Sequence, residues 1–388
     1  MAWYIDRSRI QAYQDCKRLR FLNYHWRGRG LERRALGLPL LNGQQLHQGL
    51  AALLCGESID ATITTIGTTY RNIVHTRGIH LEDPTAVDFL VAEQLALLEG
   101  LLRAWAAVRF PALCAEYDVV AIEKEQPWTI TPGLIDMVRC DALVRRKSDG
   151  VLFILEFKSV ATASEGWIES WQHNSQLLAN TRAVETLYQE PVGGILIEGI
   201  VKGRRAMDKG AMSPFKGLIT QQSPLCYGYR QREKVTNSYI YDTSWSAKAE
   251  KFAVWEQMPI TQWLAFHLTE ADKAALFVQI PPLRPTNRDL QRWERQTIAQ
   301  ERMVEADVAE VLAVQQFQDD DIDRDALDNV LDEHFPQNHN HCFRYFGHPC
   351  AFEKLCFNPQ VAEDPLGSGL YQVRIPHHPT EVQDDHTT

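Results

Sequence analysis

Residues 141–158 read DALVRRKSDGVLFILEFK, and this stretch is the most informative feature of the chain. Apolar and β-branched residues, typical of strands, flank a Ser-Asp-Gly turn signal within residues 147–150. If the turn is a four-residue loop, Asp141 pairs with Glu156, and opposed strand residues hold their Cβ atoms roughly 4.5–5.5 Å apart. Lys158 follows Glu156 by two positions and shares its face. The sequence therefore predicts a β-hairpin that sets two carboxylates opposite each other beside a lysine.

Two carboxylates at this separation repel by roughly 3 kcal/mol at an effective dielectric of about 20. Either one carboxyl is protonated or a cation lies between them. Oxygen ligands suit Mg²⁺ or Mn²⁺, and Lys158 could hold a metal-activated water or stabilise a developing oxyanion. The alternative is a surface hairpin with an ordinary Glu-x-Lys tripeptide, because short motifs often match by chance.

The composition is that of a soluble globular protein: 388 residues, of which 45% are hydrophobic and 23% charged. We expect a cytoplasmic protein with no membrane association, since no secretory leader and no apolar run of about 18 residues is present. The net charge of −10 argues against a protein that coats nucleic acid indiscriminately.

Charge is nevertheless distributed unevenly along the chain. Residues 17–34 are strongly basic, a second basic cluster contains Lys202, Arg204 and Arg205, and residues 319–328 are acidic. The basic clusters are either solvated faces or a phosphate-binding rim around a site, because contacts to a nucleic-acid backbone need only local positive charge.

Periodicity and turn signals predict an α/β (α+β) fold, with a central mixed sheet flanked by helices. Expected helices cover residues 8–26, 43–55, 86–109, 165–190, 244–256 and 289–317. Expected strands cover residues 117–129, 134–146, 151–159 and 193–201, the first three forming a meander. A late hairpin is expected within residues 225–241.

Two polar residues stand on helices that flank the hairpin in sequence. His47 lies in Gly43–His47, at the start of a predicted helix, and is either a core histidine or a metal ligand. Gln176 lies in the helix that follows the Glu-x-Lys strand, and such a helix begins near the carboxyl end of the strand. Gln176 therefore either orients Lys158 or a DNA phosphate, or faces solvent.

Four cysteines form a possible metal-binding set that joins the two ends of the chain. Cys342, Cys350 and Cys356 are separated by seven and five residues, and Cys16 lies in the first predicted helix. Structural zinc sites usually pair cysteines two to four residues apart, so a four-cysteine iron–sulfur cluster fits better. The alternatives are a zinc knuckle that uses His341 or His348, or simple thiols.

Several chemistries have no motif in this chain. No G-x-x-x-x-G-K-[ST] phosphate loop is present, nor H-E-x-x-H, nor G-x-S-x-G. An ATP-driven motor, a zinc peptidase and a serine hydrolase are therefore not expected.

In this order the elements resemble the PD-(D/E)XK nuclease superfamily, in its RecB-like branch with an iron–sulfur cluster. That branch includes CRISPR-adaptation exonucleases, the AddB nuclease domain and many phage exonucleases. The resemblance implies a restriction-endonuclease-like core and a 4Fe–4S cluster joining the N- and C-terminal segments. It divides the chain into a helical segment (1–85), a nuclease core (86–242), a helical region with the late cysteines (243–375) and a polar tail (376–388).

The resemblance also implies residue roles. One or two divalent metals would be bound by His47, Asp141, Glu156 and the carbonyl of Phe157. Lys158 would position the attacking water, and Gln176 would be the glutamine of a Q-x-x-x-Y element. Lys202, with Arg204 and Arg205 in the same cluster, would contact DNA. The implied cluster ligands are Cys16, Cys342, Cys350 and Cys356.

The chain departs from the family pattern at several positions. Cys140 precedes Asp141 in place of proline, and Asn180 stands where the glutamine element has tyrosine. Lys17 follows Cys16 in place of proline, and the late cysteines are more widely spaced. Asp136 is a rival for Asp141, but the expected register pairs it beyond the end of the opposite strand.

The sequence thus predicts a Mg²⁺- or Mn²⁺-dependent DNA nuclease, and an exonuclease in particular, active in DNA processing, recombination or repair. It would act on single strands or duplex ends, with a helicase or recombination partner supplying any motor function. The alternatives are a non-cleaving DNA-binding or assembly subunit with the same fold, and a zinc-stapled scaffold.

Overall fold

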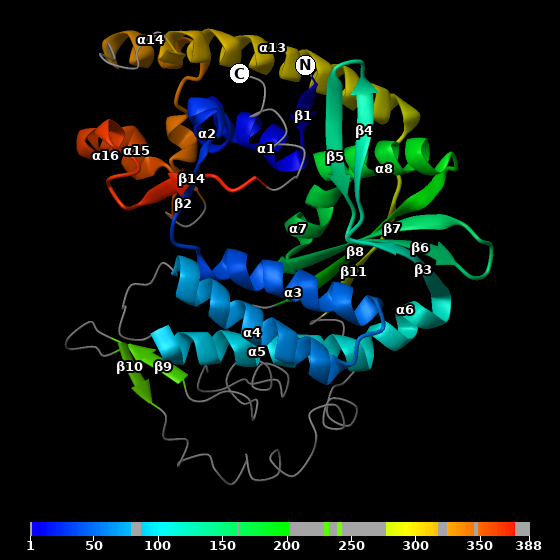
Figure 1. The fold of residues 1–388 in the computed structure, drawn as a ribbon. Helices are drawn as coiled ribbons and strands as arrows, with labels where there is room; N and C mark the ends of the chain where they lie inside the picture. Colours follow the sequence, from blue (N-terminus) through cyan, green and yellow to red (C-terminus); the bar gives the residue numbers. More distant parts are fainter. Residues whose placement is uncertain are drawn as a thin grey trace.

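A five-stranded mixed sheet forms the centre of the protein in a computed structural model (Figure 1). The structure describes residues 2–78, 87–160, 163–201, 229–232, 239–242, 277–316, 324–344 and 348–376. The strands lie in the order β11 (Phe277–Leu283), β8 (Val192–Val201), β7 (Leu152–Val160), β6 (Ala142–Arg146) and β3 (Tyr117–Ile122). β7 and β8 run parallel and the other neighbours run antiparallel, so the predicted mixed sheet is confirmed.

The hairpin of β6 and β7 has the expected register. Pairs run from Ala142 opposite Leu155 to Arg145 opposite Leu152, and the N–H of Arg146 donates to the carbonyl of Val151 at 2.9 Å. Continued by one residue, this register sets Asp141 against Glu156. The tight turn ends at Gly150, whose φ of +72° is a conformation that favours glycine.

The predicted three-strand meander is wrong, because each of its first two strands is divided in two. β4 (Glu125–Thr131) and β5 (Leu134–Arg139) leave the central sheet and form a second, three-stranded sheet with β1 (Trp3–Ile5). The chain bends at Glu123, whose φ is +45°, and again at Asp141, whose carbonyl accepts the N–H of Glu123 at 3.0 Å. The two sheets therefore separate at two acidic residues.

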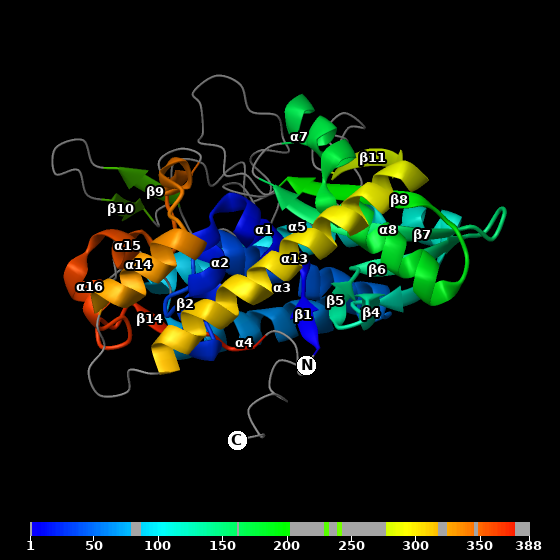
Figure 2. The same ribbon diagram turned by 90° about the horizontal axis from the view of Figure 1, so that it is seen from above.

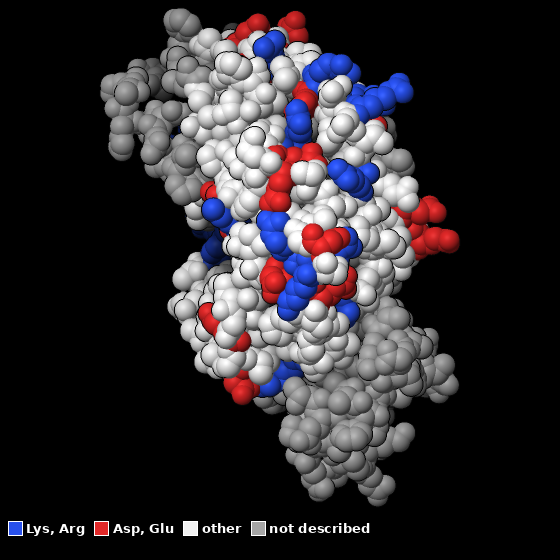
Figure 3. Space-filling view, turned by 90° about the vertical axis from the view of Figure 1, so that its right-hand side faces the viewer, with Lys and Arg blue, Asp and Glu red and all other residues white. Residues whose placement is uncertain are grey.

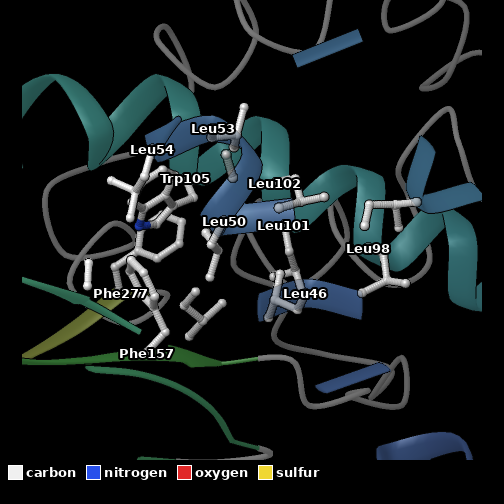
Figure 4. Close-up of a cluster of buried hydrophobic side chains, with 14 of the residues drawn as sticks. Leu46, Leu50, Leu53, Leu54, Leu98, Leu101, Leu102, Trp105, Phe157 and Phe277 are labelled. Carbon is white, nitrogen blue, oxygen red and sulfur yellow. The ribbon is translucent and has the colours of Figure 1, made fainter. Parts of the chain in front are cut away.

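Three helices cover one face of the central sheet: α3 (Leu38–Leu54), α4 (Ile59–Arg77) and α5 (Val87–Val108). Leucines at helical spacing on α3 and α5 pack around Trp105 and against Phe157 of β7 (Figure 4). A Cβ on Gly49 would lie 2.7 Å from Leu102, so this glycine lets α3 approach α5 closely. α3 starts five residues earlier than predicted, and α4 was not predicted. The short α6 (Phe110–Glu116) leads from α5 into β3.

The opposite face is covered by helices from the crossover between β7 and β8. The predicted helix 165–190 is divided into α7 (Glu165–Ser170), a 3₁₀ turn η3 (Trp171–His173) and α8 (Ser175–Tyr188). The break occurs at Asn174, whose side chain caps α8 by accepting the N–H of Gln176 at 2.9 Å. The long α13 (Asn287–Gln316) also packs here, with Trp293 stacked on Trp128 of β4.

The N- and C-terminal segments pack together beside the sheets, and α13 runs from the central sheet to them (Figure 2). The predicted helix 8–26 is two helices, α1 (Arg7–Asp15) and α2 (Lys17–Tyr24), separated by the extended residue Cys16. The turn η1 (Trp26–Gly28) follows them. The C-terminal elements are α14 (Arg324–His334), η5 (His339–His341), β12 (Phe343–Arg344), β13 (His348–Pro349), α15 (Glu353–Phe357), α16 (Pro359–Glu363) and β14 (Tyr371–Val373). β14 pairs antiparallel with β2 (Leu31–Arg33).

Further predictions concern residues 225–241, 244–256 and 319–328. The expected late hairpin is confirmed as β9 (Tyr229–Arg232) paired antiparallel with β10 (Tyr239–Asp242). The acidic stretch 319–328 is helical in part, because α14 begins at Arg324. The predicted helix 244–256 lies outside the described residues. Among the helices that the structure describes, none has the length and apolar character that crossing a membrane requires.

Candidate metal centre

Asp141 lies at the start of the hairpin, where contacts from two other elements fix its carboxylate. Its Oδ2 accepts the backbone N–H of Phe157 at 2.7 Å, and its Oδ1 lies 3.2 Å from Nδ1 of His47 on α3. Burial acts to raise the pKa of Asp141, but His47, the charge of Lys158 and the Phe157 N–H outweigh it, so the pKa is lowered. Asp141 is therefore held as a carboxylate.

A third potential ligand, Glu123, meets this pair. Ligand atoms of His47, Glu123 and Asp141 all lie within 4.8 Å of one another, and each residue is partly buried. Burial, and next the charge of Asp141, raises the pKa of Glu123. A cation bound between them would remove this repulsion. Sequence reasoning missed Glu123, because this residue lies inside the stretch 117–129 that was predicted as one continuous strand.

Glu156 is 1% exposed and is surrounded by hydrogen-bond donors. Its Oε2 accepts from Lys158 Nζ at 3.0 Å and from Gln176 Nε2 at 2.7 Å, and its Oε1 accepts from Asn180 Nδ2 at 2.6 Å. Burial raises the pKa of Glu156 to about 6; Asp141 adds to this effect and Lys158 opposes it. The pKa of the deeply buried Glu156 carboxyl group is thus raised only moderately above its ordinary value.

α8 contributes both carboxamides because they are four residues apart and so lie on one helix face. The expectation that Gln176 orients Lys158 is met only indirectly, since Gln176 binds the carboxylate that also holds Lys158. Asn180, which occupies the tyrosine position of the family pattern, supplies the second carboxamide donor. Asp136 lies in the other sheet, paired with Ile5 and Trp128, and is remote from this hairpin.

The structure thus brings together part of the metal-ligand set that the resemblance implies. His47 and Asp141 meet, with Glu123 as the third member, while Glu156 lies beside them with its oxygens occupied by donors. Phe157 contacts Asp141 through its N–H. Its ring packs edge-on to His47 at 6.5 Å between centroids, which fixes the imidazole over the strand.

Positive charge reaches the site from Lys158 and from Arg7 at the start of α1. Arg7 keeps solvent contact, yet desolvation lowers its pKa, and the carboxylates Glu156 and Asp141 act in the opposite direction. This arginine was not singled out from the sequence. It follows β1 closely, and β1 pairs with β5 of the second sheet.

The four cysteines predicted as a set line one cavity. Cys16, Cys342, Cys350 and Cys356 line a small pocket, together with Asn338. The N–H of Asn338 donates to the sulfur of Cys16 at 3.3 Å. Burial raises the pKa of Cys356 to about 12, and the neighbouring thiols add to this effect.

His341 also lines this cavity, whereas the side chain of His348 lies outside the described residues. In the part of the chain that the structure describes, no three of the cysteine sulfurs all lie within 4.8 Å of one another. The four thiols thus share a cavity but are spaced more widely than the ligands of the His47–Glu123–Asp141 group.

Three of the seven basic residues in the stretch 17–34 make structural contacts. Arg18 binds Asp332, Arg20 binds Glu301 and Arg33 donates to backbone carbonyls, all across the interface between the terminal segments. The second basic cluster, Lys202, Arg204 and Arg205, lies outside the described residues. On the face that carries the turn of β6 and β7, basic and acidic side chains alternate (Figure 3). Arg18, Arg20 and Arg33 are therefore occupied by contacts within the protein and are not part of a phosphate-binding rim.

Comparison of the sequence with models of protein families and with curated proteins gave no match. The functional assignment therefore depends on the geometry of the site.

Proposed function

We propose that the protein is a Mg²⁺- or Mn²⁺-dependent deoxyribonuclease that hydrolyses phosphodiester bonds, acting as an exonuclease on DNA ends. The observation that carries this proposal is the convergence of His47, Glu123 and Asp141 next to the Glu156–Lys158 ion pair. Pure DNA binding does not require clustered carboxylates, because they repel phosphate. A hydrolytic site does, because clustered carboxylates bind the metal.

The donor set fits a hard divalent cation. Two carboxylates and an imidazole converge, and the pKa of Glu123 is raised by burial and by Asp141, so a cation there is favoured. Residues His47, Glu123 and Asp141 would bind it, with Glu156 adjacent. When bound, the metal would lower the pKa of a water molecule and neutralise charge on the scissile phosphate.

The protein's own residues then position the reactants. Lys158, held by Glu156 at 3.0 Å, provides an ammonium that hydrogen-bonds the attacking water and steadies developing negative charge. Gln176 and Asn180 fix the Glu156 carboxylate, so the lysine has one defined position. Arg7 adds positive charge that favours an approaching phosphate.

The proposal is tested by incubating end-labelled single- and double-stranded DNA with the protein and Mn²⁺ or Mg²⁺. Wild type is expected to digest DNA, while Glu156→Ala and Lys158→Ala lower the rate at least a hundredfold. Glu123→Gln should weaken metal binding, measured by calorimetry, by about tenfold or more, since it removes one charged ligand. Glu125→Gln, two residues further along on β4, is the matched control.

Digestion at equal rates by wild type and Glu156→Ala would reject the site. Metal-independent DNA binding without cleavage by wild type would favour the second candidate, a non-cleaving DNA-binding subunit that retains the fold. Release of nucleotides from labelled ends, as opposed to internal nicking of circular DNA, distinguishes exonuclease from endonuclease action.

We further propose that Cys16, Cys342, Cys350 and Cys356 hold a 4Fe–4S cluster. The four thiols line one pocket. Seven and five residues separate the three late cysteines, whereas the paired cysteines of structural zinc sites usually lie two to four residues apart, and this spacing supports the proposal. The Asn338 N–H to Cys16 contact is of the kind that stabilises cluster thiolates.

Anaerobic purification tests this cluster. The protein should be brown and contain iron and labile sulfide, and Cys350→Ala should lose the colour and lower the melting temperature. Cys55→Ala is the control, because Cys55 is exposed and lies on α3's C-terminal end. A colourless protein that contains zinc would support the zinc alternative and overturn the iron–sulfur proposal.

A further inference from the structure

Two tryptophan rings form a corner beside Lys158. The ring centroids of Trp167 and Trp171 are 6.1 Å apart with their planes at 79°, and Nζ of Lys158 lies 5.5 Å from the Trp171 centroid. Trp171 is 5% exposed, whereas Trp167, on α7, is half-buried and retains solvent contact. An aromatic surface is therefore present at the edge of the proposed phosphodiester site.

Gly199 in the central sheet leaves space for the ring of Trp167. Gly199 of β8 is the register partner of Lys158 on β7. A Cβ on Gly199 would lie 2.8 Å from Cη2 of Trp167, closer than real side chains approach. The indole of Trp167 thus occupies the space that a side chain at position 199 would fill.

Trp171 carries a second unusual feature. Its indole nitrogen is buried and has no hydrogen-bond partner among the described residues. Buried indole N–H groups usually find a hydrogen-bond partner. The packing of these two rings leaves the N–H of Trp171 without one in the described part of the chain. A donor adjacent to Lys158 is left for water or for a bound molecule.

We propose that Trp167 stacks on a nucleobase of single-stranded DNA, which makes an unpaired strand end the preferred substrate of the site. This inference rests on the proposed nuclease function. Bases inside a duplex are stacked on both faces, while those of a single strand expose a face to an aromatic side chain. Such stacking is tolerant of sequence, and Lys158 and Arg7 supply charge for the adjoining phosphate.

Fluorescence anisotropy of labelled single-stranded oligothymidylate tests this proposal, with Ca²⁺ replacing Mg²⁺ so that binding is separated from cleavage. Trp167→Leu fills the space without an aromatic face and should bind about tenfold more weakly, while Trp167→Phe should stay within about threefold of wild type. An oligonucleotide with an abasic site at its end should bind wild type and Trp167→Leu equally. Binding of a blunt hairpin duplex should be the same for all three proteins.

The glycine provides an independent test. Gly199→Ala should weaken single-strand binding in wild type by pushing the indole aside, but should have no further effect in the Trp167→Leu background, where the smaller side chain can yield. Equal effects in both backgrounds, or equal single-strand binding by Trp167→Leu and Trp167→Phe, would overturn the stacking role.

The two proposals fail in different ways. If wild type cuts DNA but Trp167→Leu keeps the wild-type ratio of single- to double-strand cleavage, the stacking proposal is wrong and the nuclease stands. If wild type never cuts DNA with Mg²⁺ or Mn²⁺, the nuclease proposal is wrong, whatever Trp167 contributes to binding.

Discussion

Glu156 is the residue around which the candidate site is organised. A carboxylate that is 1% exposed would normally be protonated, yet three donors approach its two oxygens. Two of the donors are neutral carboxamides, which stabilise the anion without neutralising the charge that attracts a metal. Burial raises the pKa of Glu156 to about 6, while the charge and hydrogen bond of Lys158 act in the opposite direction.

Replacing Asn180 tests this balance. Asn180→Ala removes the donor to Oε1 of Glu156, which disfavours the ionised form and raises the Glu156 pKa further above its ordinary value. The acid limb of the pH profile of kcat/KM should therefore move to higher pH. Loss of a hydrogen bond to a charged group should also slow DNA hydrolysis by about tenfold or more below pH 7.

Thr186→Ala is the control for this change. Thr186 lies exposed on the same helix and donates only to a backbone carbonyl within the helix. An acid limb that stays in place in Asn180→Ala, as it should in Thr186→Ala, would show that Asn180 does not act on Glu156.

At the scale of elements, the bend between two sheets creates the site. β3 and β6 belong to the central sheet, whereas β4 and β5 continue the same chain segments into the second sheet. Residues at such a bend leave the regular ladder, so their side chains are free to turn inward. Glu123 and Asp141 both lie there, and α3 brings His47 to the same point.

α14 contacts α13 through His334, whose imidazole lies between two carboxylates. Nδ1 of His334 lies 2.9 Å from Asp307 and Nε2 lies 3.0 Å from Glu310. The hydrogen bond to Asp307 is the largest of the effects that raise the pKa of His334, and the charges of Glu310 and Glu333 act in the same direction.

The raised pKa makes α14 docking pH-dependent. The protonated form stabilises the folded state fully below the unfolded pKa of 6.5, and the contribution is lost as pH rises through the higher folded pKa. His334→Gln should lower the free energy of unfolding by about 0.5–1 kcal/mol at low pH and by less at high pH. Thermal unfolding at several pH values measures this, with the exposed His75→Gln as control. An equal difference at all pH values would contradict the prediction.

At the scale of the whole molecule, an apolar core and a buried ion pair join the two ends of the chain. Glu301 on α13 accepts hydrogen bonds from Arg20 at 2.8 Å and from Trp3 at 3.1 Å, and both side chains of the ion pair are fully buried. β14 extends β2, and Tyr371 stacks on Phe352. The termini are therefore held together independently of any cluster ligand.

Breaking this ion pair should destabilise the fold strongly. Glu301→Ala leaves the Arg20 guanidinium buried without its counter-charge, and we expect a loss of about 3–5 kcal/mol in the free energy of unfolding. Glu305→Ala, exposed on the same helix, should change stability by less than about 0.5 kcal/mol. The double variant Arg20→Met, Glu301→Leu should recover much of the loss. Denaturant unfolding gives all three values, and equal stability of Glu301→Ala and Glu305→Ala would contradict this account.

The local features of this protein could be predicted from its sequence. Alternation of apolar residues around a Ser-Asp-Gly turn specifies the hairpin and its register, because both depend on neighbours a few residues apart. Asp141, Glu156 and Lys158 could therefore be placed relative to one another. Gln176 followed from the strand-to-helix connection, and the mixed sheet from the order of elements.

The groups from distant parts of the chain that complete the site could not be predicted in this way. Glu123 reaches Asp141 because a strand bends at a non-glycine residue with positive φ, a conformation that its sequence does not signal. Arg7 follows β1, which pairs with the distant β5, and Asn180 reaches Glu156 from α8. Such contacts depend on how sheets and helices pack over long separations, and packing energies are not encoded in any local pattern of residues.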